Sequence, residues 1–144
     1  GCRCLQSVSF QEGVQGIGVQ AFLSCQSLTS VTIPGSVKAI EHRAFQDCEM
    51  LASVTISEGV QRIDECVFEG CTALTSVELP EGVEKIVRGA FADCTALTCA
   101  AIPASVTEVQ SGAFQTWERP TIHAPAGSYA ERYARANNIK FQPL

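Results

Sequence analysis

The sequence predicts an α/β repeat solenoid: a parallel β-sheet on one face, short helical or irregular returning segments on the other, and a C-terminal helical cap. The first observation is a period, because equivalent residues recur every 23 residues. A repeat of about 20–50 residues marks a unit that buries its apolar face only by stacking on its neighbours. The recurring residues are Phe22, Phe45, Phe68, Phe91 and Phe114, together with Cys2, Cys25, Cys48, Cys71 and Cys94, and Trp117 takes the next cysteine position.

The second observation is a short alternating pattern in every repeat. In the second repeat Val31 and Ile33 alternate with the polar residues Ser30 and Thr32. A period of two is typical of a strand with one buried face. Because the pattern returns in each repeat, we expect every repeat to add one strand to a parallel sheet.

A turn and a returning segment follow each predicted strand. Small residues recur at the turn, and proline often precedes them by two residues; proline cannot donate to a strand ladder, so the strand ends there. In the second repeat Val37, Ile40 and Ala44 then follow at spacings of three and four. These spacings favour short helical turns or irregular structure, because about a dozen residues are too few for a long helix. The small turn residues are Gly13, Ser36, Gly59, Gly82 and Ser105.

We divide the chain into five 23-residue repeats over residues 1–116 and a C-terminal capping segment over residues 117–144. The repeat register breaks after Trp117, and a shift of one residue brings Ile122 and Ala124 inward. At the opposite end no cap is recognisable. We therefore expect apolar side chains to be open to solvent there and further repeats to precede them; these residues are Leu5, Val8, Ile17 and Phe22.

The capping segment contains one amphipathic pattern, which predicts a short helix over about residues 128–137. Ser128 is placed to accept a free N–H at the start of the helix. Tyr129 and Tyr133 fall on one face. Asn137 and Asn138 are expected to end the helix.

The repeat unit C-x-x-L-x-x-V-x-I-P-x-x-V-x-x-I-x-x-x-A-F resembles the BspA-like, or Treponema-type, leucine-rich repeats of bacterial and protist surface proteins. Five consecutive units keep the Cys, Leu and Ala-Phe positions, and Val67 is the one exception to Ala. The resemblance implies a leucine-rich-repeat fold and a role in adhesion or protein binding at the cell surface or after secretion. It implies no catalysis.

Composition and charge narrow the possible partners. The net charge of −5 comes without any cluster of Lys and Arg, which argues against binding to nucleic acid or to an anionic membrane. No stretch approaches the ~20 continuous apolar residues of a membrane span. We therefore expect a protein ligand, with no nucleic acid and no membrane insertion.

We expect no catalytic site, no metal site and no cofactor. Neither His42 nor His123 is accompanied by a recognisable nucleophile or carboxylate constellation. The pair Cys2 and Cys4 is too little for a zinc site, since no Cys-x-x-Cys occurs.

Most of the eight cysteines have a structural interpretation. The five that follow the period are expected to be buried, stacked as small apolar side chains. Cys4, Cys66 and Cys99 fall outside this column. Cys66 and Cys99 align with polar positions and are expected to face solvent, where they are candidates for reactivity or for oxidation into a dimer.

The positions that the period leaves free are the candidates for binding. On the predicted concave face of the sheet they form hydroxyl-rich rows flanked by acidic turns: Ser30, Thr32, Ser53, Thr55, Ser76 and Glu78. The alternative is that Ser and Thr on a solvated strand bond to one another and need no ligand. At the level of function, the chain is expected to be a non-catalytic protein-binding module; the alternatives are a structural spacer or an intracellular scaffold without a ligand of its own.

Overall fold

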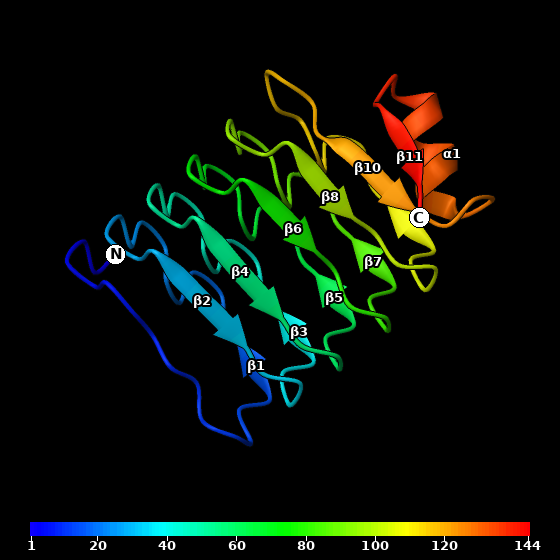
Figure 1. Ribbon diagram of the computed structural model, residues 1–144. Helices are drawn as coiled ribbons and strands as arrows, with labels where there is room; N and C mark the ends of the chain where they lie inside the picture. Colours follow the sequence, from blue (N-terminus) through cyan, green and yellow to red (C-terminus); the bar gives the residue numbers. More distant parts are fainter.

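The computed structural model describes residues 1–144 and shows a solenoid with two parallel sheets (Figure 1). We call the larger layer the front sheet. Its hydrogen bonding is interrupted once, between β4 and β6. On one side of the interruption β2 pairs with β4 and Ser30 of β2 also bridges to Ser7; on the other side β6, β8, β10 and β11 form a continuous ladder. The front sheet consists of β2 (Ser30–Ile33), β4 (Ser53–Ile56), β6 (Ser76–Glu78), β8 (Cys99–Ala101), β10 (Thr121–Ala124) and β11 (Phe141–Pro143).

A second parallel sheet, the back sheet, follows the turn of each repeat. It contains five strands of two residues each, in the order β1-β3-β5-β7-β9. Equivalent residues lie in register, as Ile40 pairs with Ile63 and Ile63 with Ile86. These strands are β1 (Gly16–Ile17), β3 (Ala39–Ile40), β5 (Arg62–Ile63), β7 (Lys85–Ile86) and β9 (Glu108–Val109). The repeat solenoid predicted from the sequence is thus confirmed, and the sequence pattern had not revealed this second sheet.

The returning segments take the irregular form, because they consist of turns and contain no helix. The same position in successive repeats has a positive φ: 57° at Arg43, 55° at Cys66, 70° at Gly89 and 77° at Gly112. A left-handed residue breaks any helical run, since side chains with a Cβ adopt this conformation only at a cost. The spacings of three and four therefore bring apolar side chains inward by way of turns.

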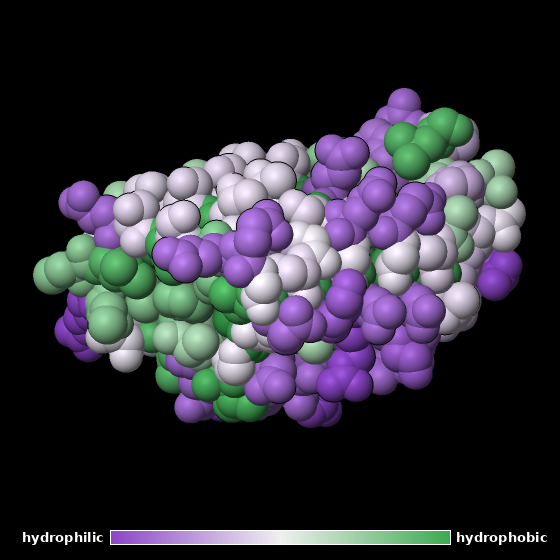
Figure 2. Space-filling model, turned by 90° about the horizontal axis from the view of Figure 1, so that it is seen from below, coloured by the Kyte–Doolittle hydropathy of each residue, from purple (hydrophilic) through white to green (hydrophobic).

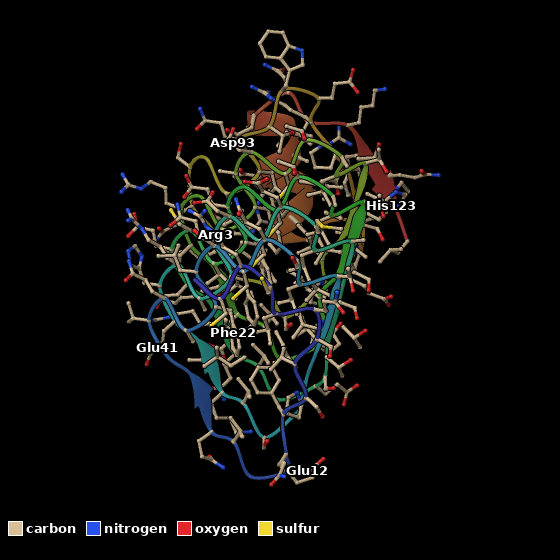
Figure 3. All side chains as sticks on the ribbon, turned by 90° about the vertical axis from the view of Figure 1, so that its left-hand side faces the viewer. Arg3, Glu12, Phe22, Glu41, Asp93 and His123 are labelled. Atoms are coloured by element: carbon tan, nitrogen blue, oxygen red, sulfur yellow. The ribbon has the colours of Figure 1, made fainter.

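The core lies between the two sheets and the turns, and its phenylalanines form one stacked column. The rings of Phe22, Phe45, Phe68, Phe91 and Phe114 follow one another at centroid separations of 5.1, 5.5, 5.4 and 5.2 Å. Figure 3, viewed along the solenoid, shows Phe22 pointing into this interior. Each phenylalanine thus packs on its equivalents in the neighbouring repeats, which is why the period of 23 residues is so strict.

The last turn is closed by α1 (Tyr129–Ala136), which packs against β9, β10 and β11. Ser128 is the N-cap and accepts a hydrogen bond from the backbone N–H of Glu131. Asn137 is the C-cap, and the next residue, Asn138, has a φ of 53°. Ile122 and Ala124 are fully buried, as the shifted register predicts. Trp117, by contrast, is 95% exposed and does not continue the cysteine column.

The N-terminal end carries exposed apolar side chains. Figure 2 shows apolar side chains gathered at this end and hydrophilic ones along much of the remaining surface. Leu5, Val8 and Phe22 are half-buried and pack against the core, so the expectation that they are open to solvent holds only in part. The expectation fails for Ile17, which is buried. Its strand β1 pairs with β3, so the two-residue back sheet covers a side chain that the front sheet alone would leave open.

Candidate binding surface

The outward rows of the front sheet contain all six residues singled out in the sequence. Each of them is exposed: Ser30, Thr32, Ser53, Thr55, Ser76 and Glu78. Alternation along the strands explains this, because Val31, Ile33 and Val77 occupy the positions between them and are buried. In register, Ser30 lies beside Ser53 and Thr32 beside Thr55.

A hollow of about 480 Å³ opens over the carboxyl ends of β4, β6 and β8. It coincides with the interruption between β4 and β6, where Val54 is half-buried although its equivalents Val31 and Val77 are buried. Its floor includes Ala101, whose methyl group occupies the row position that Glu78 fills on β6 and His123 fills on β10. A small side chain between two larger ones leaves this space open. The residues that line it are Val54, Thr55, Ile56, Glu58, Glu78, Leu79, Pro80, Glu81, Ala101, Ile102, Pro103, Pro125 and Leu144.

Acidic side chains supply all the charge of this hollow. They are Glu58, Glu78 and Glu81, and no basic residue lines it. None of the three takes part in an ion pair. Glu81 is held in place, because its carboxylate accepts a hydrogen bond of 3.3 Å from the backbone N–H of Ala104 in the next repeat.

The hollow brings together two of the six predicted residues, Thr55 and Glu78. Thr32 instead lines a separate hollow of about 370 Å³ beside Phe10. Ser30, Ser53 and Ser76 form the other outward row and line neither. Leu144 and Ala101 also line the hollow, although neither was a candidate from the sequence: Leu144 lies far from the repeats, and Ala101 has no polar group.

Four of the five cysteines of the column are buried as predicted, whereas Cys2, at the open N-terminal end, is exposed. Thiols of the column also donate hydrogen bonds. Cys48, Cys71 and Cys94 donate from Sγ to the carbonyl oxygen of the phenylalanine 26 residues earlier in the chain, over 3.2, 3.3 and 3.1 Å. Burial raises the pKa of Cys48 and of Cys94 to about 12 and that of Cys71 well above its ordinary value. These thiols are therefore structural and held in the unreactive neutral form.

The expectation that Cys66 and Cys99 face solvent holds only in part, because both are half-buried. Cys66 lies at a left-handed turn position against Gly89. Burial, followed by the nearby carboxylate of Glu69, raises its pKa to about 12. Cys99 lies within β8, between its row neighbours Ser76 and Thr121. All eight cysteines are free.

Native thiol labelling checks this distribution. At pH 8 we expect a thiol reagent to modify Cys2 and Cys4 rapidly, because both are exposed, and to modify all eight cysteines once the chain is unfolded in denaturant. Mass spectrometry of the labelled peptides identifies the sites. Rapid labelling of Cys25, Cys48 or Cys71 in the folded protein contradicts the buried column.

The returning face carries a short charged row rather than a catalytic arrangement. Glu65 accepts a 2.6 Å contact from the guanidinium of Arg88 and lies 3.6 Å from Nδ1 of His42. The hydrogen bond from Arg88 lowers the pKa of Glu65. The pairs join equivalent positions of three successive repeats, so they add to stacking; exposed pairs of this kind contribute about 0–1 kcal/mol. No group of three or more His, Cys, Asp or Glu side chains is arranged to hold a metal ion.

The comparison with known families decides the classification. Residues 1–119 match the BspA type leucine-rich repeat region in 6 copies. The chain belongs to the BspA-type leucine-rich repeat family. The tightly stacked turns with one front-sheet strand per repeat are therefore those of a leucine-rich-repeat solenoid.

Solved structures of leucine-rich repeat proteins are similar to this chain. A leucine-rich repeat protein of T. pallidum is 31% identical with a TM-score of 0.74; the match covers 76% of this chain and 52% of that protein. A leucine-rich cell surface protein of Faecalibacterium prausnitzii is 36% identical with a TM-score of 0.76, covering 87% of this chain and 33% of that protein. The chain thus spans about half the length of the T. pallidum protein and about a third of the length of the Faecalibacterium prausnitzii protein.

Similarity to a more distant solved structure supports the fold and nothing beyond it. The pneumococcal vaccine antigen PcpA is 20% identical over 79% of this chain and 36% of that protein, with a TM-score of 0.62. No protein with a curated description matches the sequence. The one helix, α1, is too short to cross a membrane, and no other helix occurs.

Proposed function

We propose that this leucine-rich repeat array is a non-catalytic protein-binding module of a cell-surface or secreted protein, which recognises host or matrix protein through the outer face of its front sheet. The observation that carries the proposal is the hollow over β4, β6 and β8, whose three carboxylates have no ion-pair partner within the chain. The opposite side of each turn is occupied by the charged row and the tightly stacked returning segments. The returning face also has a hollow, of about 440 Å³, but it is mostly polar and includes the ion pair between Glu65 and Arg88. The front-sheet hollow instead combines carboxylates that have no ion-pair partner with apolar side chains, so we assign the binding of another protein to the front sheet.

Two further observations support a surface role in adhesion. The family match covers most of the chain, and one similar structure is described as a leucine-rich cell surface protein. Repeat solenoids present extended surfaces whose many small contacts suit protein partners. The net charge of −5, without a cluster of Lys and Arg in the sequence, disfavours binding to nucleic acid or to an anionic membrane.

A binding assay with a matched pair of variants tests the proposal. We expect saturable binding of the chain to one or more members of a panel of purified extracellular-matrix proteins. Ser53→Arg places a long charged side chain in the middle of the front face and should weaken that binding by about tenfold or more. Gln61→Arg adds the same charge at an exposed position on the returning side and should leave it unchanged.

The two variants also separate the proposal from its alternative. Equal loss of binding in both variants would show that added charge, and not the front face, is responsible. Absence of saturable binding to the whole panel would favour a spacer that holds another part of its protein at a distance.

A further inference from the structure

We propose that the hollow over β4, β6 and β8 binds an extended protein segment that carries a lysine or arginine two residues from a leucine-sized apolar side chain. The inference deepens the proposed function and rests on it, since it assigns a chemistry to the partner of the front face. It follows from a combination of charge, apolar surface and shape at one place.

The charge of the hollow selects a cationic partner. Glu58, Glu78 and Glu81 line it without any basic residue, and none of them has an ion-pair partner within the chain. Glu58 and Glu81 occupy equivalent positions of successive repeats, the position that Glu12 occupies in the first repeat. Figure 3 shows Glu12 at the corner where the solenoid turns from the front sheet to the back sheet. A cation seated in the hollow is therefore approached by carboxylates from the corner and from the sheet.

The apolar part of the hollow is supplied by the cap. Leu144 is 75% exposed, yet its backbone N–H donates to the carbonyl oxygen of Ala124 over 3.1 Å. Because the preceding strand β11 is paired with β10, this exposed leucine is held at the sheet edge. Pro125 and the methyl group of Ala101 complete the apolar surface beside it. Covering an exposed leucine by a partner's apolar side chain is favourable.

The size of the hollow favours a segment over a folded surface. About 480 Å³ accommodates a few side chains and is within the range of pockets that enclose one small ligand. In an extended segment, residues i and i+2 point to the same side at a separation of about 7 Å. One side chain of such a pair can reach the glutamates while the other lies on Ala101 and Leu144. Lysine and arginine suit the first place because their aliphatic stems pack on apolar surface while the charged head meets carboxylate.

Peptide titrations with the intact chain test this assignment. The probe is a fluorescein-labelled peptide of sequence Gly-Arg-Ser-Leu-Gly-Arg-Ser-Leu-Gly, followed by fluorescence anisotropy. We expect saturable binding that weakens when either arginine or leucine is replaced throughout, by glutamine or by serine respectively. Raising the ionic strength should weaken binding, because the glutamates are exposed and screened by salt.

Variants of the chain locate the site. Glu78→Gln combined with Glu81→Gln should lower the affinity by about tenfold. Glu84→Gln combined with Glu118→Gln removes the same net charge at exposed positions outside the hollow and should change it less than about twofold. Ala101→Leu fills the floor without altering charge and should also lower the affinity by about tenfold. Thermal unfolding of each variant confirms that the fold is retained.

Three outcomes overturn the inference and leave the proposed function standing. The first is equal loss in the two double-glutamine variants, which would show attraction to the net charge alone. The second is no saturable binding of the probe, and the third is binding that Ala101→Leu leaves unchanged. In each case matrix binding that is sensitive to Ser53→Arg and insensitive to Gln61→Arg would leave the front face as the binding surface. Loss of matrix binding with retention of site-specific peptide binding would count against the proposed function instead.

Discussion

Phe68→Ala is expected to lower the free energy of unfolding by about 3–5 kcal/mol, the range for truncating a buried phenylalanine. Phe68 is fully buried in the middle of the phenylalanine column. Its ring lies 5.5 Å from that of Phe45 and 5.4 Å from that of Phe91, with interplanar angles of 8° and 13°. Alanine removes the contacts with both neighbouring repeats at once. Urea unfolding followed by circular dichroism measures the loss.

Two comparison variants make this result specific. Phe22→Ala removes a half-buried ring at the end of the column and should cost less, because Phe22 has only one stacked neighbour of the column, Phe45. Phe68→Leu keeps most of the volume and should also cost less, so it remains measurable if the alanine variant does not fold. A cost below about 1 kcal/mol for Phe68→Ala would mean that the column does not hold adjacent repeats together.

The phenylalanine column was predictable from the sequence because buried positions of a solenoid recur at a fixed spacing along the chain. Each repeat stacks on a near copy of itself, so the same side chain must fill the same space every 23 residues. The alternation around Val31 and Ile33 predicted the front sheet for a similar reason. A short run in which apolar and polar residues alternate indicates a strand with one buried face.

The back sheet was not predictable by the same means. Its strands have two residues each, which is too short for any alternation to appear. The apolar spacings of three and four in the returning segments are those of a helix, yet the left-handed residues at Arg43 and Cys66 exclude one. Glycine marks this left-handed position only at Gly89 and Gly112; where Arg43 and Cys66 stand instead, the residue type gives no sign of the positive φ.

The candidate binding surface was predictable in part. Alternation placed Thr55 and Glu78 correctly on the outer face. The hollow beside them depends on what lies across the sheet, namely the small side chain of Ala101 and the return of the chain end at Leu144. Pairing of β11 with β10 brings the C-terminus to this edge, and such long-range pairing cannot be inferred from a repeat pattern that ends before it.

Gly59→Ala is expected to cost about 2–4 kcal/mol, through the sum of two effects. Gly59 has a φ of 123°, a conformation that side chains with a Cβ rarely adopt. An added methyl group would also overlap the carbonyl oxygen of Gly35 in the preceding repeat. Because that oxygen belongs to the backbone, a side-chain rotation cannot relieve the overlap, and the two turns would have to separate.

Gly82→Ala separates the two effects, since Gly82 occupies the equivalent position one repeat later. Its φ is 98°, but nothing lies within 4 Å of the place where a Cβ would stand. Alanine there should cost only the conformational term of about 1–2 kcal/mol. Urea unfolding of both variants therefore gives the contribution of the close approach between turns as the difference between them. Equal costs would show that backbone conformation alone requires glycine. A larger cost at Gly59 would show that the turns of the second and third repeats pack backbone to backbone. Such packing would fix the corner where Glu58 borders the hollow.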